Sequence, residues 1–157
     1  MIYVMSDIHG NLARFESVMK QIDLKPADTL YILGDVVDRY PDGIKILRRI
    51  MKMPNVKMLL GNHEHMMLNA IGDCLYAKPE PYSDNRLIRL WYRNGGQVTN
   101  EYLKHIRKNL REEVFAYLRL LPLNLDVEVN GIKYKLVHGS PTENYICLLY
   151  TSPSPRD

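Results

Sequence analysis

The N-terminal part of the chain contains three short apolar segments, and each one ends in a loop of polar side chains. The segments are residues 2–5 (IYVM), 29–33 (TLYIL) and 55–60 (NVKMLL), and the loops that follow begin SDIHGN, GDVVDRY and GNHEH. Each loop leads into a stretch with apolar residues at helical spacing, as in LARFESVMKQI. Strands and helices alternating in this order predict right-handed crossovers and a parallel sheet, and therefore an α/β fold.

Polar residues follow directly after each predicted strand. Asp7, Asp35 and Asn62 occupy equivalent positions, 28 and 27 residues apart. The carboxyl ends of parallel strands lie at one edge of a sheet, and ligands bind in the crevice outside that edge. We therefore expect three residues that are remote in sequence to lie close together in space.

A hairpin is predicted near the end of the chain. Residues 125–129 and 132–137 are two alternating runs that flank Asn130-Gly131, and this dipeptide is a strong hairpin signal. The antiparallel pair is expected to form a second sheet or to extend the first. In either case it would carry His138 at its far end.

The loops together supply the side chains of a metal site: Asp7, His9, Asp35, Asn62, His63 and His138. Carboxylate, imidazole and amide oxygen suit a divalent ion of intermediate hardness, such as manganese, iron or zinc. Asp7 and His9 could hold one ion, and Asp35 could bridge to a second ion. Two neighbouring ions can activate a water molecule and stabilise an in-line displacement at phosphorus.

Each of these motifs has a simpler explanation when taken alone. An isolated Asp-x-His is more often a capped turn, and Asn-His after a strand is usually an Asx-turn that begins a helix. Gly34 and Gly61 could serve only to form tight turns. The simple explanations weaken because every ligand type falls at the end of a strand on one predicted edge.

The middle of the chain, residues 72–122, is predicted to be mostly helical, with a turn at Gly95-Gly96. Four cations in this stretch have near-helical spacing, namely Lys104, Arg107, Lys108 and Arg111. We interpret them as a solvated helix face rather than as a contact for nucleic acid or a phosphoprotein.

Composition restricts the cellular setting and the partners. The chain has 157 residues, enough for one domain, and its net charge of +3 indicates no particular partner. The two cysteines have no paired spacing, and no segment resembles a signal peptide or a membrane span. We expect a cytoplasmic protein that binds neither nucleic acid nor membrane.

Four motifs in this order and spacing resemble those of the calcineurin-like metallophosphoesterases: SDIHGN, LGDVVDR, LLGNHE and LVHG. More narrowly, they are similar to the branch that holds the PPP-type serine/threonine protein phosphatases and the symmetrical diadenosine tetraphosphate hydrolases. WYRNGG resembles the bacterial and phage members of that branch. The resemblance covers about residues 1–146 and implies an α/β/β/α sandwich, here incomplete at its C-terminus.

The resemblance also implies a role for each site residue. Two divalent ions, manganese first and iron or zinc as alternatives, would be held by Asp7, His9, Asp35, Asn62 and His138, with Asp35 bridging. His63 would be the general acid and Asp38 its orienting partner. Arg39 and Asn62 would bind the substrate phosphate, Arg39 in a bidentate manner. Metal-bound hydroxide would attack phosphorus directly.

The function implied is hydrolysis of phosphate monoesters, with phosphoserine and phosphothreonine proteins as the first choice of substrate and phosphotyrosine as a further one. A symmetrical diadenosine tetraphosphate hydrolase is the alternative within the same class. A catalytically silent module that binds phosphorylated partners is the alternative from another class. The intact His63, Asp38 and Arg39 argue against the silent module.

The chain departs from the family pattern in three respects. Ser6 and Tyr40 stand where the family usually has glycine, and no histidine follows His138, whereas the family supplies one more for the second metal. Residues 147–157 (CLLYTSPSPRD) match the in-frame translation of a transposase-type sequencing adaptor. We therefore expect a truncated domain at 1–146, a non-native tail at 147–157, and weak or no activity for this fragment.

Overall fold

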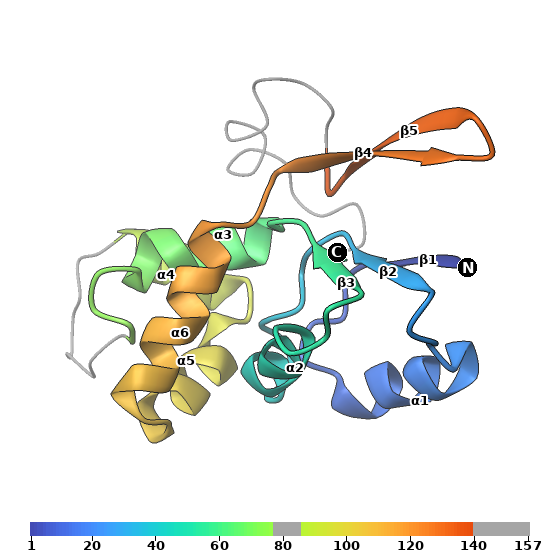
Figure 1. Cartoon of the computed structure of the whole chain (residues 1–157). Helices are drawn as coiled ribbons and strands as arrows, with labels where there is room; N and C mark the ends of the chain where they lie inside the picture. The colour runs from blue at the N-terminus through green and yellow to red at the C-terminus, as the bar shows by residue number, and fades with distance from the viewer. Residues whose placement is uncertain (77–85, 140–157) are drawn as a thin grey trace.

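Three parallel strands form the central sheet of the computed structural model, which describes residues 1–76 and 86–139 (Figure 1). The strands are β1 (Ile2–Met5), β2 (Thr29–Ile32) and β3 (Val56–Met58), in the spatial order β1-β2-β3. Met5 pairs with Ile32, and Ile32 pairs with Met58, so the three strands end level with one another. The predicted parallel sheet is confirmed.

Strand β3 ends earlier than its apolar run suggests. The run continues through Leu59 and Leu60, and both residues are buried. The backbone N–H of Leu60, however, donates to the carbonyl of Pro122 at 3.0 Å, and not to β2. The chain therefore leaves the parallel sheet here to meet the segment that leads into the C-terminal hairpin.

Two helices provide the crossovers between the parallel strands, α1 (Leu12–Ile22) and α2 (Gly43–Ile50). Helix α1 begins where the Asn11 side chain accepts a hydrogen bond from the backbone N–H of Arg14 at 3.1 Å, an ordinary N-cap. Figure 1 shows both helices below the strands. Apolar residues of both helices and of β2 are buried together in the core, among them Phe15, Leu47 and Ile32.

Four further helices follow β3: α3 (Asn62–Ile71), α4 (Arg86–Arg93), α5 (Gly96–His105) and α6 (Lys108–Arg119). Helix α3 contacts α4 and α6, and α2 contacts α5 and α6, so these helices share the core with the sheet. Trp91 and Phe115 are the largest side chains that are fully buried among the described residues. The helical middle and the turn at Gly95, with φ 93°, agree with the sequence prediction.

The predicted hairpin forms from β4 (Asn124–Val129) and β5 (Ile132–Val137). Asn130 and Gly131 have φ of 52° and 79°, as a type I′ turn requires. The hairpin is a sheet of its own and extends away from the helices in Figure 1. An apolar groove of about 250 Å³ lies between β1 and the hairpin, lined by residues such as Val4, Val127 and Leu136.

Further expectations from the sequence concern membrane spans, cellular setting and the domain boundary. None of the helices in residues 1–76 and 86–139 has the length and apolar character needed to cross a membrane. The cytoplasmic setting stays a prediction. The domain boundary predicted at residue 146 and the tail 147–157 lie outside the described residues.

Candidate active site

The loops that follow the parallel strands are held together by backbone hydrogen bonds. The N–H of His9 donates to the carbonyl of Asp35 at 2.9 Å, and that of Gly10 donates to Val36 at 2.7 Å. The third loop is linked through α3, because the N–H of His63 donates to Asp35 Oδ1 at 3.0 Å. The convergence predicted from the spacing of the strand ends is therefore present, and Asp35 lies at its centre.

The backbone of these loops is strained. Eight non-glycine residues in the described chain have positive φ, and five of them are predicted site or loop residues: Asp7, His9, Asp35, Asp38 and Arg39. A left-handed conformation costs an ordinary residue about 1–2 kcal/mol. Such strain persists only where surrounding contacts fix the backbone, and it collects at functional sites.

The buried side chain of Glu64 supplies much of this support. Its Oε2 accepts hydrogen bonds from the N–H groups of Asp35 at 2.9 Å and Gly61 at 3.1 Å, and its Oε1 accepts from Val36 at 2.8 Å and Val37 at 3.2 Å. Burial and the charge of Asp35 raise the pKa of Glu64 to about 7, although the amide donors oppose the rise. We did not predict this role from the sequence, where Glu64 is only the last letter of GNHE.

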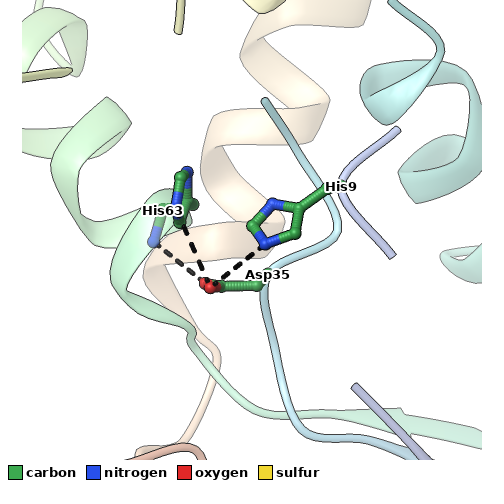
Figure 2. Close-up of side chains that lie close together, drawn as sticks. All are labelled: His9, Asp35 and His63. Carbon is green, nitrogen blue, oxygen red and sulfur yellow. Dashed lines mark hydrogen bonds and ion pairs between the residues drawn. The ribbon is translucent and has the colours of Figure 1, made fainter. Parts of the chain in front are cut away.

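Three imidazole rings face the Asp35 carboxylate. Their Nε2 atoms lie 3.8 Å (His9), 4.0 Å (His63) and 3.3 Å (His138) from Asp35 Oδ2. Figure 2 shows the rings of His9 and His63 directed toward the carboxylate. The ligand atoms of His9, Asp35 and His63 all lie within 4.8 Å of one another, close enough to share a metal ion.

The other nitrogen of each ring is fixed by an acceptor. His9 Nδ1 lies 3.2 Å from the Val37 carbonyl, and His138 Nδ1 lies 2.8 Å from the Leu33 carbonyl. His63 Nδ1 lies 2.8 Å from Asp38 Oδ2. Since these oxygens can only accept, each Nδ1 carries a proton and each Nε2 faces the centre of the site. Metal-binding histidines in proteins have this arrangement.

The amide of Asn62 completes the group. One of its polar atoms lies 2.8 Å from His138 Nε2 and 2.9 and 3.0 Å from the two oxygens of Asp35. With nitrogen in that place, the amide donates to its neighbours. With oxygen there, the amide faces the two acceptor oxygens of Asp35, and a cation between them would make that orientation favourable. The donor set of carboxylate, amide and imidazole fits a divalent metal.

The histidines differ in basicity. Burial and the neighbouring His63 ring lower the pKa of His9. Burial alone would lower the pKa of His138, but the hydrogen bond and charge of Asp35 outweigh it and raise that pKa to about 9. Burial would also lower the pKa of His63, but the hydrogen bond that His63 donates to Asp38 and the charges of Asp35 and Asp38 outweigh burial and raise that pKa. A metal ion that bound through His138 would therefore displace a proton.

The predicted acid pair is formed and fully enclosed. Asp38 is 0 % exposed and His63 is 1 % exposed. Trp91 and Thr99 donate hydrogen bonds to the same carboxylate. Neither donor was assigned to the site from the sequence, which predicted only the turn at Gly95-Gly96 between them.

Two predicted site residues lie on the solvent side. The Asp7 side chain is half exposed, and its Oδ1 lies 3.8 Å from His9 Nε2. Arg39 is also exposed, and its backbone N–H donates to the carbonyl of Gly95 at 3.1 Å. The structure thus gathers His9, Asp35, Asn62, His63 and His138 tightly, and leaves Asp7 and Arg39 exposed at the rim of this cluster.

The basic stretch on α5 and α6 is largely occupied by local contacts. Lys104 pairs with Glu101 at 3.0 Å, and Lys108 pairs with Glu112 at 3.5 Å. Arg111 donates to the carbonyls that end α5, Leu103 at 2.9 Å and Ile106 at 2.7 Å. These contacts favour the interpretation as a helix face.

Comparison with known proteins decides the family. The profile of the calcineurin-like phosphoesterases matches residues 1–154. The chain belongs to the calcineurin-like phosphoesterase family. The family resemblance expected from the four motifs and the α/β architecture expected from the strand pattern are both confirmed. This family hydrolyses phosphoesters and uses divalent metal ions.

Two curated relatives carry different activities in their names. A serine/threonine-protein phosphatase 2 of Salmonella typhimurium is 28% identical over 146 residues, which cover 92% of this chain and 61% of that protein. A symmetrical bis(5'-nucleosyl)-tetraphosphatase of Pectobacterium atrosepticum is 34% identical over 80 residues, covering 50% of this chain and 28% of that protein. The chain therefore spans less than two thirds of either relative.

A solved structure agrees with the fold. A hypothetical protein from Pyrococcus horikoshii superposes with a TM-score of 0.53 at 23% identity, covering 90% of this chain and 56% of that one. At this identity the likeness concerns the fold alone.

Proposed function

We propose that this calcineurin-like phosphoesterase chain carries the dinuclear metal centre and the general acid of a phosphate monoester hydrolase. One observation supports the proposal above all others. Three histidines present Nε2 to the buried Asp35 carboxylate while an acceptor fixes each Nδ1.

The residues divide into two metal-binding sets. Asp7, His9 and Asp35 would hold one ion, and Asp35, Asn62 and His138 would hold the other. The mixed oxygen and nitrogen donors suit manganese first, with iron and zinc as alternatives. When bound, the ions would lower the pKa of a coordinated water and neutralise charge on the phosphoryl group.

The protein's own groups perform the remaining tasks. His63 has a raised pKa, so its Nε2 can carry the proton that the leaving oxygen needs, and Asp38 holds the ring in the required tautomer. Arg39, exposed at the rim, would bind phosphoryl oxygens through its planar guanidinium. The amide nitrogen of Asn62 would donate to the same phosphate while its oxygen faces the metal.

Two substrate classes are comparably supported. A phosphoprotein is favoured by the Salmonella phosphatase, whose match extends over 92% of the chain. Diadenosine tetraphosphate is favoured by the higher identity of the tetraphosphatase match, 34% over 80 residues. We place the phosphoprotein first because that relative matches along almost the whole chain.

The test is to offer both substrates to the full chain with Mn²⁺. We expect slow phosphate release from a phosphoserine peptide, consistent with the weak activity expected of this chain, and we expect chelation of the metal to abolish it. ADP release from diadenosine tetraphosphate, without action on the peptide, would select the alternative substrate. No product from either substrate, together with calorimetric binding of the phosphopeptide, would favour the silent binding module.

A further inference from the structure

We propose that Trp91 and Thr99, on helices α4 and α5, are positioning residues for the acid His63, acting through the Asp38 carboxylate. The inference rests on the proposed function and extends it to helices α4 and α5, which lie outside the four loop motifs of the site. Trp91 and Thr99 lie 53 and 61 residues beyond Asp38 in the sequence. Neither touches the proposed metal centre.

Both oxygens of the Asp38 carboxylate are engaged by buried donors. Trp91 Nε1 donates to Oδ1 at 3.1 Å and to Oδ2 at 2.9 Å. The Thr99 hydroxyl donates to Oδ1 at 2.6 Å and accepts a bond from the Asp38 backbone N–H at 3.0 Å. His63 Nδ1 takes the last place, at Oδ2. All four residues are at most 1 % exposed.

A buried carboxylate with these donors has one stable orientation. Its charge is costly to bury unless hydrogen bonds replace the lost water, and here an indole and a hydroxyl replace it. Thr99 engages Oδ1 and Trp91 bridges both oxygens, so the carboxylate is fixed with Oδ2 in contact with His63 Nδ1. The ring is thereby held with Nε2 facing the phosphoryl site, 4.0 Å from Asp35 Oδ2.

The glycines of the turn between α4 and α5 allow the Trp91 indole to lie next to Asp38. A Cβ on Gly96 would lie 2.4 Å from the Trp91 ring, so only glycine lets the indole lie against the start of α5. The preceding Gly95, at φ 93°, accepts the backbone N–H of Arg39 through its carbonyl. The turn therefore also supports the strained Asp38-Arg39 backbone, at φ 70° and 68°.

A purely structural role for these residues is the competing explanation, since Trp91 is also the largest buried side chain of the described core. The two explanations differ in the step they affect. A positioning role affects proton donation to the leaving group, whereas loss of packing affects the folded fraction and all substrates alike. The experiment must therefore vary the leaving group.

The variants are Thr99→Val, which removes the hydroxyl, Thr99→Ser, which keeps it, and Trp91→Phe, which keeps a ring but no N–H. Tyr102→Phe on α5 is the control. On phenyl phosphate with Mn²⁺ we expect Thr99→Val and Trp91→Phe to lower kcat about 10- to 10²-fold with little change in KM. On 2,4-dinitrophenyl phosphate, whose phenolate leaves without a proton, we expect a change of less than about 3-fold. Thr99→Ser and Tyr102→Phe should resemble the unchanged chain.

A second readout does not depend on activity. The chain contains one tryptophan, so a single indole N–H resonance in a ¹⁵N–¹H spectrum reports the Asp38 contact. We expect this resonance to shift in Asp38→Asn and in Thr99→Val, and to stay in place in Tyr102→Phe. An unshifted resonance in Asp38→Asn would overturn the inference whatever the kinetics.

Other outcomes are equally decisive. Equal losses on the two esters, or a Thr99→Ser variant as impaired as Thr99→Val, would show a structural role only and overturn the inference. An unchanged chain that is inert toward both esters would contradict the proposed function. The indole resonance would then still decide whether Trp91 and Thr99 hold Asp38.

Discussion

At the scale of single residues, the site is defined by which nitrogen of each histidine is engaged. A backbone carbonyl fixes Nδ1 of His9 and of His138, whereas a carboxylate fixes Nδ1 of His63. A carbonyl partner fixes the tautomer of the ring and adds no charge, whereas the Asp38 carboxylate at Nδ1 adds a charge that stabilises the protonated His63 ring. The carboxylate partner separates His63 from the other two histidines and supports its proposed role as acid, although its ligand atom lies close enough to those of His9 and Asp35 to share a metal ion with them.

Replacement of His63 by alanine tests that separation. As the acid, His63 contributes about 10²–10⁴-fold to turnover, so His63→Ala should reduce kcat by that factor. Mn²⁺ affinity, measured by calorimetry, should be nearly unchanged. Unchanged turnover would remove His63 from the mechanism. Loss of Mn²⁺ binding along with activity would show instead that His63 is a metal ligand.

At the scale of elements, the sequence predicts those features that depend on local pattern. Apolar runs ending in polar loops predicted the parallel sheet, and Asn130-Gly131 predicted the hairpin. The support of the site could not be predicted in this way. Three successive amides donate to Glu64, and Trp91 donates to Asp38. These bonds depend on how α3, α4 and α5 pack, and the periodicity of the sequence does not predict that packing.

The turn between α4 and α5 gives a prediction about stability. In Gly96→Ala the added methyl would meet the Trp91 ring at 2.4 Å, and overpacking of this kind costs about 1–3 kcal/mol. Urea unfolding should show that loss. Gly131→Ala gives the comparison, because an added Cβ there has nothing within 4 Å and only the φ of +79° would cost stability, about 1–2 kcal/mol. A larger loss for Gly131→Ala than for Gly96→Ala would contradict the proposed packing.

At the scale of the whole molecule, a few long-range bonds tie the N-terminus and the C-terminal hairpin to the parallel sheet. His138 Nδ1 bonds to the carbonyl of Leu33, and the N–H of Leu60 donates to the carbonyl of Pro122. These two bonds fix both ends of the hairpin segment next to the site. At the other end, the amino group of Met1 pairs with Asp28, just before β2. Of these contacts, only that of His138 was expected from the sequence, which placed His138 at the end of the hairpin.

The Met1–Asp28 pair makes the folded chain sensitive to acid. The hydrogen bond from the amino terminus lowers the pKa of Asp28 below its ordinary 3.8. A carboxyl group whose pKa is depressed by folding contributes stability above its unfolded pKa and loses it as the pH falls through the folded value. The unfolding free energies of the unchanged chain and Asp28→Asn should therefore differ by a constant amount near neutral pH and converge below about pH 4. A difference that grows toward acid would contradict this pairing.

A two-metal centre built around Asp35 would be visible in a calorimetric titration of the metal-free chain with Mn²⁺. We expect two bound ions per chain, with the ion at Asn62 and His138 the weaker. His138→Ala should keep only the tighter ion. An unchanged chain that binds no Mn²⁺, or a His138→Ala variant with the same two-ion isotherm, would contradict the account.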